Sequence, residues 1–152
     1  MEDLWIQVSI GLGLVISLLF SEFLGLAAGG MVVPGYFALS LTDPKRVVTT
    51  ILVGLATFGI VRFMNFFMII YGRRRTVLMI LVGFLVGALV RNFVTFDVGR
   101  LEVDLELIGF IIPGLIAIWL DRQGVVETLS TLLVSSAVVR MCLILIRGGE
   151  VF

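Results

Sequence analysis

Two stretches of the sequence share one pattern of glycine and proline. They read Gly30-Met31-Val32-Val33-Pro34-Gly35-Tyr36-Phe37-Ala38 and Gly109-Phe110-Ile111-Ile112-Pro113-Gly114-Leu115-Ile116-Ala117, at an offset of 79 (109 − 30). After one gap the match continues at an offset of 78 (125 − 47), where Val47, Val48, Thr50, Val61 and Arg62 align with Val125, Val126, Thr128, Val139 and Arg140. Apolar matches are frequent by chance in an apolar chain, but glycine, Pro-Gly, threonine and arginine in one order are not. The pattern predicts an internal duplication.

The chain as a whole is strongly apolar. Of its 152 residues, 60% are hydrophobic and 14% are charged, whereas about 25% are charged in an ordinary soluble domain. A helix needs about 20 residues to span the hydrocarbon of a bilayer, so at most about six spans fit. The apolar runs are continuous and lack the alternation of barrel strands. We therefore expect an all-α, multi-pass transmembrane bundle that forms one integral membrane domain over residues 1–152.

Charged residues divide the chain into five to six apolar segments. These cover residues 4–21, 23–42, 47–71, 76–90, 107–120 and 125–146. The second and the fifth contain the Pro-Gly pairs, and glycine adds backbone freedom while proline removes an N–H donor. We expect both to be broken or re-entrant helices, interrupted at Gly30, Pro34 and Gly35 and at Gly109, Pro113 and Gly114. The two repeats then cover residues 4–72 and 76–147, approximately.

Two arrangements of the Pro-Gly segments are open. If both cross the membrane, they run antiparallel and the halves form an inverted repeat, in which matching broken helices are typical of a transport site near the midplane. If both are re-entrant, they lie on the same side of the membrane. Alternatively, the Pro-Gly pairs only kink two packed helices.

The charges between the segments predict an orientation. The positive-inside rule places Arg73, Arg74 and Arg75 in the cytoplasm and the acidic loop 97–106 outside. Lys45 and Arg46 fall outside in both arrangements and are an exception to the rule. The N-terminus is outside if the Pro-Gly segments cross, and inside if they are re-entrant.

Two arginines lie inside apolar segments. Arg62 follows Val47, the start of its segment, at a separation of 15 (62 − 47), and Arg140 follows Val125 at the same separation (140 − 125). At about 1.5 Å per residue both lie well within the hydrocarbon layer, where a charge costs roughly 2.5–3.5 kcal/mol. Their matching places in the two repeats indicate that both face the interior of the bundle.

Three interpretations of these arginines compete. They pair with Glu22, Glu127 or backbone carbonyls; they extend toward an interface; or their guanidinium groups bind the carboxylates of a ligand bidentately. Ten of the eleven basic residues are arginine, which suits a polyanionic substrate. The candidates for a substrate path are Arg62, Arg140, Arg91 and Glu22.

Small residues recur at every fourth position of the first segment. They are Ser9, Gly13, Ser17, Ser21 and Gly25, and the fourth segment has Gly83 and Gly87 at the same spacing. Small residues let helix backbones approach closely. The stripe predicts close packing against a partner helix, in this chain or in another.

Several function classes are excluded by what the sequence lacks. Eleven Lys and Arg balance eleven Asp and Glu, so there is no basic surface for nucleic acid, and there is no histidine. No Walker A loop, Gly-x-Ser-x-Gly motif, acid/base carboxylate pair or metal cluster is present. We therefore assign no catalytic residue, metal or cofactor to this chain, and any energy-consuming chemistry belongs to a partner.

Three stretches resemble one known family. They are residues 30–39, then Phe67-Met68-Ile69-Ile70-Tyr71-Gly72-Arg73-Arg74-Arg75, then residues 109–117 followed by Arg122-Gln123-Gly124. In order, spacing and chain length they resemble the C subunit of poly-γ-glutamate synthase, the PgsC/CapC family. Glu22 ahead of Gly25 also fits that pattern. The resemblance covers essentially the whole chain.

The resemblance implies a bacterial plasma-membrane complex in which an ATP-dependent amide ligase joins glutamates through their γ-carboxylates. This chain is then a non-catalytic, multi-pass subunit that supports polymerisation and export, and ATP and a divalent metal belong to the ligase. Its expected partners are the ligase, the other membrane subunits, the polyanionic polymer and lipid. The triplet Arg73, Arg74 and Arg75 docks the ligase, receives the polymer or only anchors the topology. The alternatives are a scaffold that only anchors the ligase and a free-standing small transporter.

Overall fold

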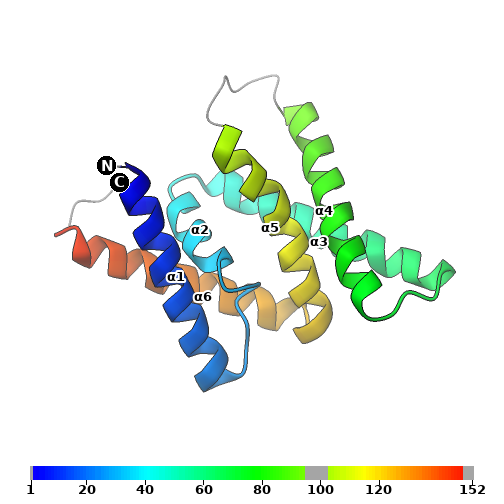
Figure 1. The fold of residues 1–152 in the computed structure, drawn as a ribbon, viewed down its shortest axis with the longest axis horizontal. Helices are drawn as coiled ribbons and strands as arrows, with labels where there is room; N and C mark the ends of the chain where they lie inside the picture. Colours follow the sequence, from blue (N-terminus) through cyan, green and yellow to red (C-terminus); the bar gives the residue numbers. More distant parts are fainter. Residues whose placement is uncertain (1, 95–102, 149–152) are drawn as a thin grey trace. The chain divides into compact units, whose positions relative to one another are not determined.

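The computed structural model describes residues 2–94 and 103–148 of the chain (Figure 1). Within these residues every regular element is a helix: α1 Glu2–Leu24, α2 Val33–Ser40, α3 Pro44–Phe67, α4 Arg73–Val94, α5 Val103–Gln123 and α6 Val125–Ile146. Each predicted apolar segment therefore contains one helix, and the all-α prediction is confirmed. The backbone from Val103 onward belongs to α5, so the predicted loop 97–106 is shorter than expected.

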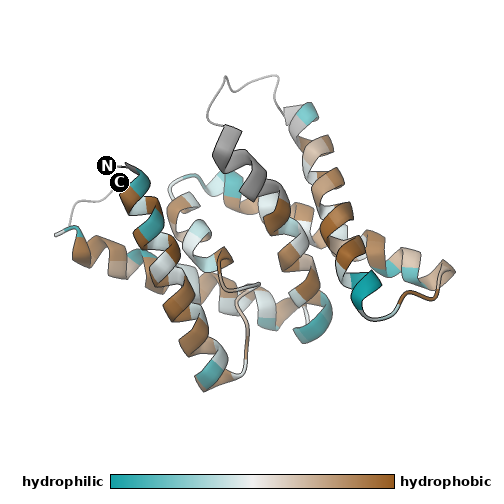
Figure 2. Ribbon diagram, viewed as in Figure 1, coloured by the Kyte–Doolittle hydropathy of each residue, from teal (hydrophilic) through white to brown (hydrophobic). Residues whose placement is uncertain are grey.

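Three helices of the described part are long and apolar enough to cross a membrane. They are Asp3–Leu24, Pro44–Phe67 and Val125–Ile146. Figure 2 shows apolar residues along the length of these helices, and the structure leaves large apolar side chains uncovered, such as Phe23, Phe66 and Leu145. Side chains of this kind on a helix surface are typical of a protein whose solvent is lipid. The number of crossings stays a prediction.

The first Pro-Gly segment is interrupted at Gly30, whereas Pro34 and Gly35, where a break was also expected, belong to a helix. Residues 25–32 are not helical, and Gly30 has a φ of 124°, which L residues with a side chain rarely adopt. The helix α2 begins only at Val33 and has Pro34 in its first turn, where no N–H donor is required. The segment is therefore unwound in its first half and helical in its second.

The second Pro-Gly segment differs from the expectation. Helix α5 continues through Pro113 to Gln123, so the break expected at Pro113 and Gly114 is absent. Proline inside a helix removes only one backbone hydrogen bond, and helices among other helices accommodate that loss. The first segment has a Gly29-Gly30 pair with positive φ angles ahead of its proline, whereas Gly109 follows Ile108.

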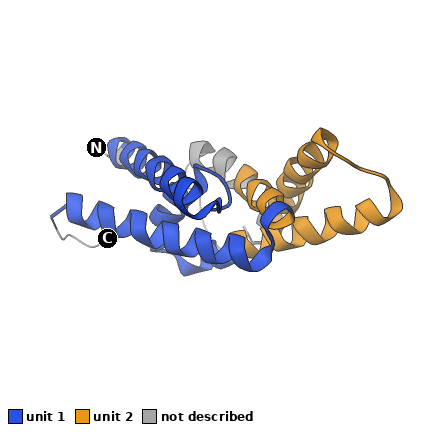
Figure 3. Ribbon diagram, turned by 90° about the horizontal axis from the view of Figure 1, so that it is seen from below, with its two compact units in different colours: residues 1–48, 122–152 blue, residues 49–121 orange. Residues whose placement is uncertain are grey.

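The chain forms two compact units, which Figure 3 shows in different colours. Unit 1 consists of residues 1–48 and 122–152 and contains α1, α2 and α6. Unit 2 consists of residues 49–121 and contains most of α3 together with α4 and α5. The units do not coincide with the predicted halves 4–72 and 76–147, because each unit takes its third helix from the other half.

The third helices show this exchange in their contacts. In unit 1, Val139 of α6 packs in one cluster with Ile16 of α1 and Ala38 of α2. In unit 2, Val61 of α3 packs with Met79 of α4 and Ile118 of α5. Val61 and Val139 are related by an offset of 78 (139 − 61), which is the offset of the predicted duplication. Equivalent valines therefore complete the cores of opposite units.

The helices α1 and α2 touch through glycine in unit 1. A Cβ atom on Gly13 would lie 2.5 Å from the backbone nitrogen of Gly35, and one on Gly35 would lie 2.7 Å from the carbonyl oxygen of Ser9. The Ser9 hydroxyl donates a hydrogen bond of 2.9 Å to the Gly35 carbonyl, and Ser17 donates to the Gly30 carbonyl at 3.4 Å. The small-residue stripe of the first segment thus packs against a partner within this chain.

Helices α4 and α5 make the corresponding contact in unit 2. A Cβ atom on Gly83 would lie 2.7 Å from both the nitrogen and the Cα atom of Gly114, and one on Gly114 would lie 2.9 Å from Ile80 Cα. Gly83 follows Gly13 at an offset of 70 (83 − 13), and Gly114 follows Gly35 at an offset of 79 (114 − 35). The duplication itself stays a prediction, and this repeated glycine contact supports it and extends it to the first helix of each half.

Candidate functional site

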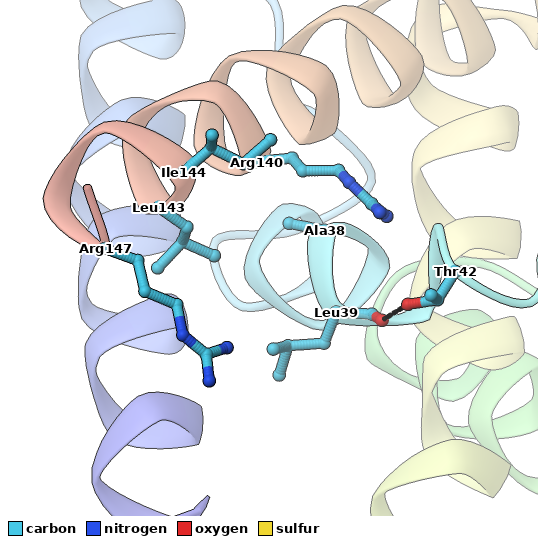
Figure 4. Close-up of a pocket in the computed structure, with 7 residues that line it drawn as sticks. All are labelled: Ala38, Leu39, Thr42, Arg140, Leu143, Ile144 and Arg147. Carbon is cyan, nitrogen blue, oxygen red and sulfur yellow. Dashed lines mark hydrogen bonds between the residues drawn. The ribbon is translucent and has the colours of Figure 1, made fainter. Parts of the chain in front are cut away.

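The first candidate site surrounds Arg140 in unit 1. A cavity of about 80 Å³ is lined by Ala38, Leu39 and Thr42 at the end of α2 and by Arg140, Leu143, Ile144 and Arg147 from α6 and its C-cap. In Figure 4 the Arg140 side chain extends over Ala38 toward Thr42, and Arg147 extends toward Leu39. No acidic residue lines this cavity in the described part of the chain.

The two arginines of this cavity differ in their contacts. Among the described residues, Arg140 is partly buried and forms no hydrogen bond or ion pair. Arg147 lies over the Trp5 ring, with 5.2 Å between its Cζ atom and the ring centroid, which is a cation–π distance. The Thr42 hydroxyl donates to the Leu39 carbonyl at 3.1 Å. The guanidinium donors of Arg140 are thus open to an anion.

The second candidate site surrounds Arg62 in unit 2. An open cavity of about 390 Å³ is lined by Arg62, Asn65 and Phe66 of α3 and by Arg75 of α4. The Arg62 side chain is exposed, and its Cζ atom lies 5.7 Å from the centroid of the Phe58 ring. Arg62 forms no ion pair with any residue that the structure describes. This arginine is therefore also open to an anion.

The three arginines of the triplet 73–75 differ in their surroundings. Arg73 and Arg74 are exposed, whereas Arg75 is turned inward and forms an ion pair with Asp121 of α5, with side chains 24% and 15% exposed. The Nε atom of Arg75 is buried and has no hydrogen-bond partner in the described structure. Only Arg73 and Arg74 present an exposed basic patch, and Arg75 belongs to the Arg62 cavity instead.

The acidic partners expected for Arg62 and Arg140 are not found. Glu22 and Glu127 are exposed, and neither forms an ion pair with Arg62 or Arg140 in the described residues. Glu22 lies near the end of α1. Arg91 and Gly109 fall outside the residues whose surroundings are described. Sequence reasoning missed Asp121, although it is the first charged residue after the fifth apolar segment.

A second residue that sequence reasoning missed is Gln123. Its Oε1 atom accepts a 2.6 Å hydrogen bond from the Ala27 backbone N–H, and its Nε2 atom donates to the Ala27 carbonyl at 2.7 Å and to Thr128 Oγ1 at 3.3 Å. It therefore pairs both backbone groups of one residue in the unwound stretch 25–32, which in lipid have no water to bind. In the sequence, the available signal was the polar amide of Gln123 directly before a glycine and beside a charged residue. In the structure this Gly124 has a φ of 106° and ends the helix.

The described residues contain no group of three His, Cys, Asp or Glu side chains that could hold a metal ion. What they do contain is two arginine-lined cavities on membrane-length helices. Fold and site together define a class: small all-helical proteins with several apolar helices long enough to cross a bilayer and with cationic cavities beside two of those helices, α3 and α6.

Comparison with known proteins narrows that class to a family. Residues 12–129 match the family described as capsule biosynthesis CapC. The chain is 38% identical over 143 residues to the PGA biosynthesis protein CapC of Bacillus subtilis (strain 168), covering 90% of this chain and 91% of the relative. It is 33% identical over 133 residues to the capsule biosynthesis protein CapC of Bacillus anthracis, covering 86% and 88%. No solved structure matches.

This chain belongs to the CapC family, which is implicated in poly-γ-glutamate capsule biosynthesis. The resemblance carried by the Pro-Gly stretches, the arginine triplet and Arg122-Gln123-Gly124 is thereby confirmed. Such a capsule system implies further synthase subunits beside this chain.

Proposed function

We propose that this chain is a non-catalytic membrane subunit of a poly-γ-glutamate synthase, and that it supports ATP-dependent polymerisation by a partner ligase and the export of the polymer. The observation that carries the proposal is the pair of arginines, Arg62 and Arg140, which line cavities on membrane-length helices without an acidic partner in the described structure. A charge within a membrane-spanning helix is energetically costly, and such residues typically mark a substrate or ion pathway.

The chemistry of the polymer fits these cavities. Glutamates joined through their γ-carboxylates leave one free carboxylate on every residue, so the polymer is a polyanion. Guanidinium groups bind carboxylates with two parallel hydrogen bonds, and such charge-assisted bonds are among the strongest in proteins. A route lined by arginines therefore lowers the cost of moving repeated carboxylates past apolar helices.

The contacts in unit 1 support the arrangement in which the first Pro-Gly segment crosses the membrane. Ser17 contacts Gly30 and Ser9 contacts Gly35, so the chain returns antiparallel along α1 after Leu24. The path between the two serines rises about 12 Å along the helix, and the unwound stretch followed by α2 covers the same path in the opposite direction. In this arrangement the N-terminus is outside.

The proposed orientation gives each charged patch a task. Arg73 and Arg74 lie in the cytoplasm, where they dock the ligase or receive the growing polymer, and residues 97–106 lie outside. ATP and the divalent metal are bound by the ligase. The complex is located in the bacterial plasma membrane with the other synthase membrane subunits.

Complementation tests this function. A polymer-producing bacterium that lacks its own copy of the gene receives either the wild-type chain or Arg140→Glu, and polymer is measured separately in the medium and in the cytoplasm. We expect Arg140→Glu to insert normally and to leave polymer on the cytoplasmic side. Polymer outside at the wild-type level would refute the export role and leave a scaffold that anchors the ligase.

Purification from the native membrane tests the partner. In a mild detergent we expect the chain to retain an ATP-dependent ligase, and Arg73→Glu with Arg74→Glu to reduce that retention. A chain that purifies alone, yet moves polymer in vesicles, would instead support a free-standing transporter.

A further inference from the structure

The two arginine cavities occupy equivalent places in the two units. In unit 2 the third helix contributes Arg62, Asn65 and Phe66, and in unit 1 it contributes Arg140, Leu143 and Ile144. Each pair of positions is related by an offset of 78 (140 − 62, 143 − 65 and 144 − 66), which is the offset of the third helices in the predicted duplication. The cavities of the two units are therefore lined by equivalent turns of α3 and α6.

Residues that contact the second arginine of each cavity, or lie opposite it, are also related by the duplication. Thr42 lines the cavity of unit 1, and at an offset of 79 (121 − 42) it corresponds to Asp121, the ion-pair partner of Arg75. Trp5 lies beneath Arg147, and at an offset of 70 (75 − 5) it corresponds to Arg75 itself. The offsets 79 and 70 are those of the repeated glycine contact. The same cavity thus occurs twice with different side chains around one shared arginine.

The charge differs between the two cavities in an informative way. Each cavity contains two arginines. One occupies an equivalent position on the third helix of each unit, Arg62 in unit 2 and Arg140 in unit 1. The other is not equivalent: it is Arg75 in unit 2 and Arg147 in unit 1. Two like charges close together repel each other, and an anion beside them offsets that repulsion. In unit 2 the carboxylate of Asp121 supplies that anion for Arg75. The corresponding position in unit 1 holds Thr42, which has no charge.

We propose that both cavities are binding sites for single carboxylates of an anionic polymer, and that Asp121, which pairs with Arg75 beside the unit 2 cavity, is an internal substitute for such a carboxylate. A water molecule needs about 10–15 Å³ of cavity, so the 80 Å³ around Arg140 admits a carboxylate group. An arriving carboxylate meets Arg62 directly and competes with Asp121 for Arg75, whose Nε atom has no partner among the described residues.

The proposed topology assigns the two sites to opposite sides of the membrane. In the proposed topology three crossings, α4, α5 and α6, separate Arg75 from Arg147 along the chain. The Arg62 site is then cytoplasmic, beside the start of α4, and the Arg140 site is external, at the ends of α2 and α6. The polymer meets the Arg62 site on entry and the Arg140 site on exit. This inference rests on the proposed function and names its two subsites.

Direct binding tests the sites. The full chain is reconstituted in nanodiscs of phosphatidylcholine, and the affinity for a short, fluorescently labelled poly-γ-glutamate oligomer is measured by titration. We expect Arg62→Gln and Arg140→Gln each to weaken binding about tenfold, the size expected for one charged hydrogen-bonding partner. The exposed Arg46→Gln is the matched control with the same loss of charge, and we expect it to bind like the wild type. An oligomer with esterified carboxylates should not bind.

Three outcomes overturn the proposal. Wild-type affinity in both cavity variants, with unchanged elution on gel filtration, excludes the sites. The sites are also excluded if Arg46→Gln weakens oligomer binding as much as the cavity variants do, because binding then depends only on the total charge of the protein. If the variants lose binding to phosphatidylglycerol in mixed nanodiscs but keep the oligomer, the cavities hold lipid headgroups. A further outcome separates this proposal from the proposed function. If oligomer binding depends on both arginines but the Arg140→Glu variant still exports polymer in cells, the two binding sites are supported and the export role is refuted.

Sidedness is tested with single cysteines in a Cys142→Ala background. Thr42→Cys and Asn65→Cys place a thiol at the edge of each cavity. In intact cells a membrane-impermeant maleimide should label Thr42→Cys only, and Asn65→Cys should require permeabilised cells. Labelling of both from the same side would contradict the entry-and-exit assignment.

Discussion

The two Pro-Gly helices, α2 and α5, share one sequence pattern and one packing contact but differ in length. Helix α2 has 8 residues and follows an unwound stretch, whereas α5 has 21 residues and runs through its proline. In both, the glycine after the proline lies against the backbone of the preceding repeat-related helix, through Gly13 and Gly35 in one unit and Gly83 and Gly114 in the other. The duplication therefore preserves the place where backbones touch and leaves the residues before the proline free to unwind or to remain helical.

The largest expected effect concerns the contact that the two regions share. Gly35→Ala brings a Cβ atom to 2.7 Å from the Ser9 carbonyl oxygen, and Gly114→Ala brings one to 2.9 Å from Ile80 Cα. Both obstacles are backbone atoms, so the helices must separate, and we expect each variant to lose about 3 kcal/mol of stability, the upper end for overpacking. Thermal unfolding in detergent measures the loss.

Gly59→Ala is the matched control, because a Cβ atom there meets nothing within 4 Å. It should unfold at the wild-type temperature or slightly above, since alanine favours the helix. A large loss in Gly35→Ala with none in Gly114→Ala would break the equivalence of the two contacts.

The next effect concerns the hydrogen bonds that Gln123 makes to the unwound stretch before α2, a stretch that α5 lacks. Gln123→Leu removes the partner of both Ala27 backbone groups. An unpaired group costs about 1–3 kcal/mol when it is fully buried, and because Ala27 is only partly buried we expect about 2 kcal/mol for the two groups together. We expect faster hydrogen exchange over residues 25–32, a lower Tm and no change in α4. Gln7→Leu, at an exposed position of α1, is the control. Unchanged exchange over residues 25–32 would mean that the unwound stretch does not depend on this clamp.

A smaller effect distinguishes the two cavities. Asp121→Asn removes the carboxylate that pairs with Arg75, and because both side chains are partly exposed we expect a loss of about 1–2 kcal/mol, between surface and buried pairs. A double-mutant cycle with Arg75→Gln measures the coupling energy. The same substitution should strengthen oligomer binding at the Arg62 site, because the internal competitor is gone. Weaker binding in Asp121→Asn would contradict its role as a substitute carboxylate.

The smallest effect concerns a hydrogen bond that only unit 1 has. Ser9 donates to the Gly35 carbonyl, whereas at the offset of 70 (79 − 9) the corresponding residue is the apolar Met79. Ser9→Ala should therefore cost about 1 kcal/mol, the usual net contribution of one hydrogen bond. The exposed Ser130, which bonds only within its own helix, provides the control Ser130→Ala. Equal unfolding temperatures for wild type and Ser9→Ala would show that close packing alone holds α2 on α1.

Much of the fold was predictable because its signals are local. Long apolar runs indicated the helices, and glycine ahead of Pro34 indicated the break in the second segment. The break expected at Pro113 failed because proline alone removes one hydrogen bond, while the positive φ angles of Gly29 and Gly30 are what carry the chain out of the helix. The interpretation in which Arg62 and Arg140 pair with Glu22 or Glu127 was also wrong, because spacing along a helix does not indicate contacts between different helices.

By itself the sequence determined that the chain is a helical, membrane-type protein with a repeated pattern, and it placed Arg62 and Arg140 at matching positions. Only the tertiary structure decided that α3 and α6 exchange between the units, that Arg75 turns to Asp121, and that Gln123 holds Ala27. The reason is physical. Helices that lie in lipid are apolar on every face, so their hydrophobic pattern does not specify which helix they pack against. Partners are chosen by close backbone approach at glycine and by the need to pair each polar group, and both depend on residues far apart in the chain.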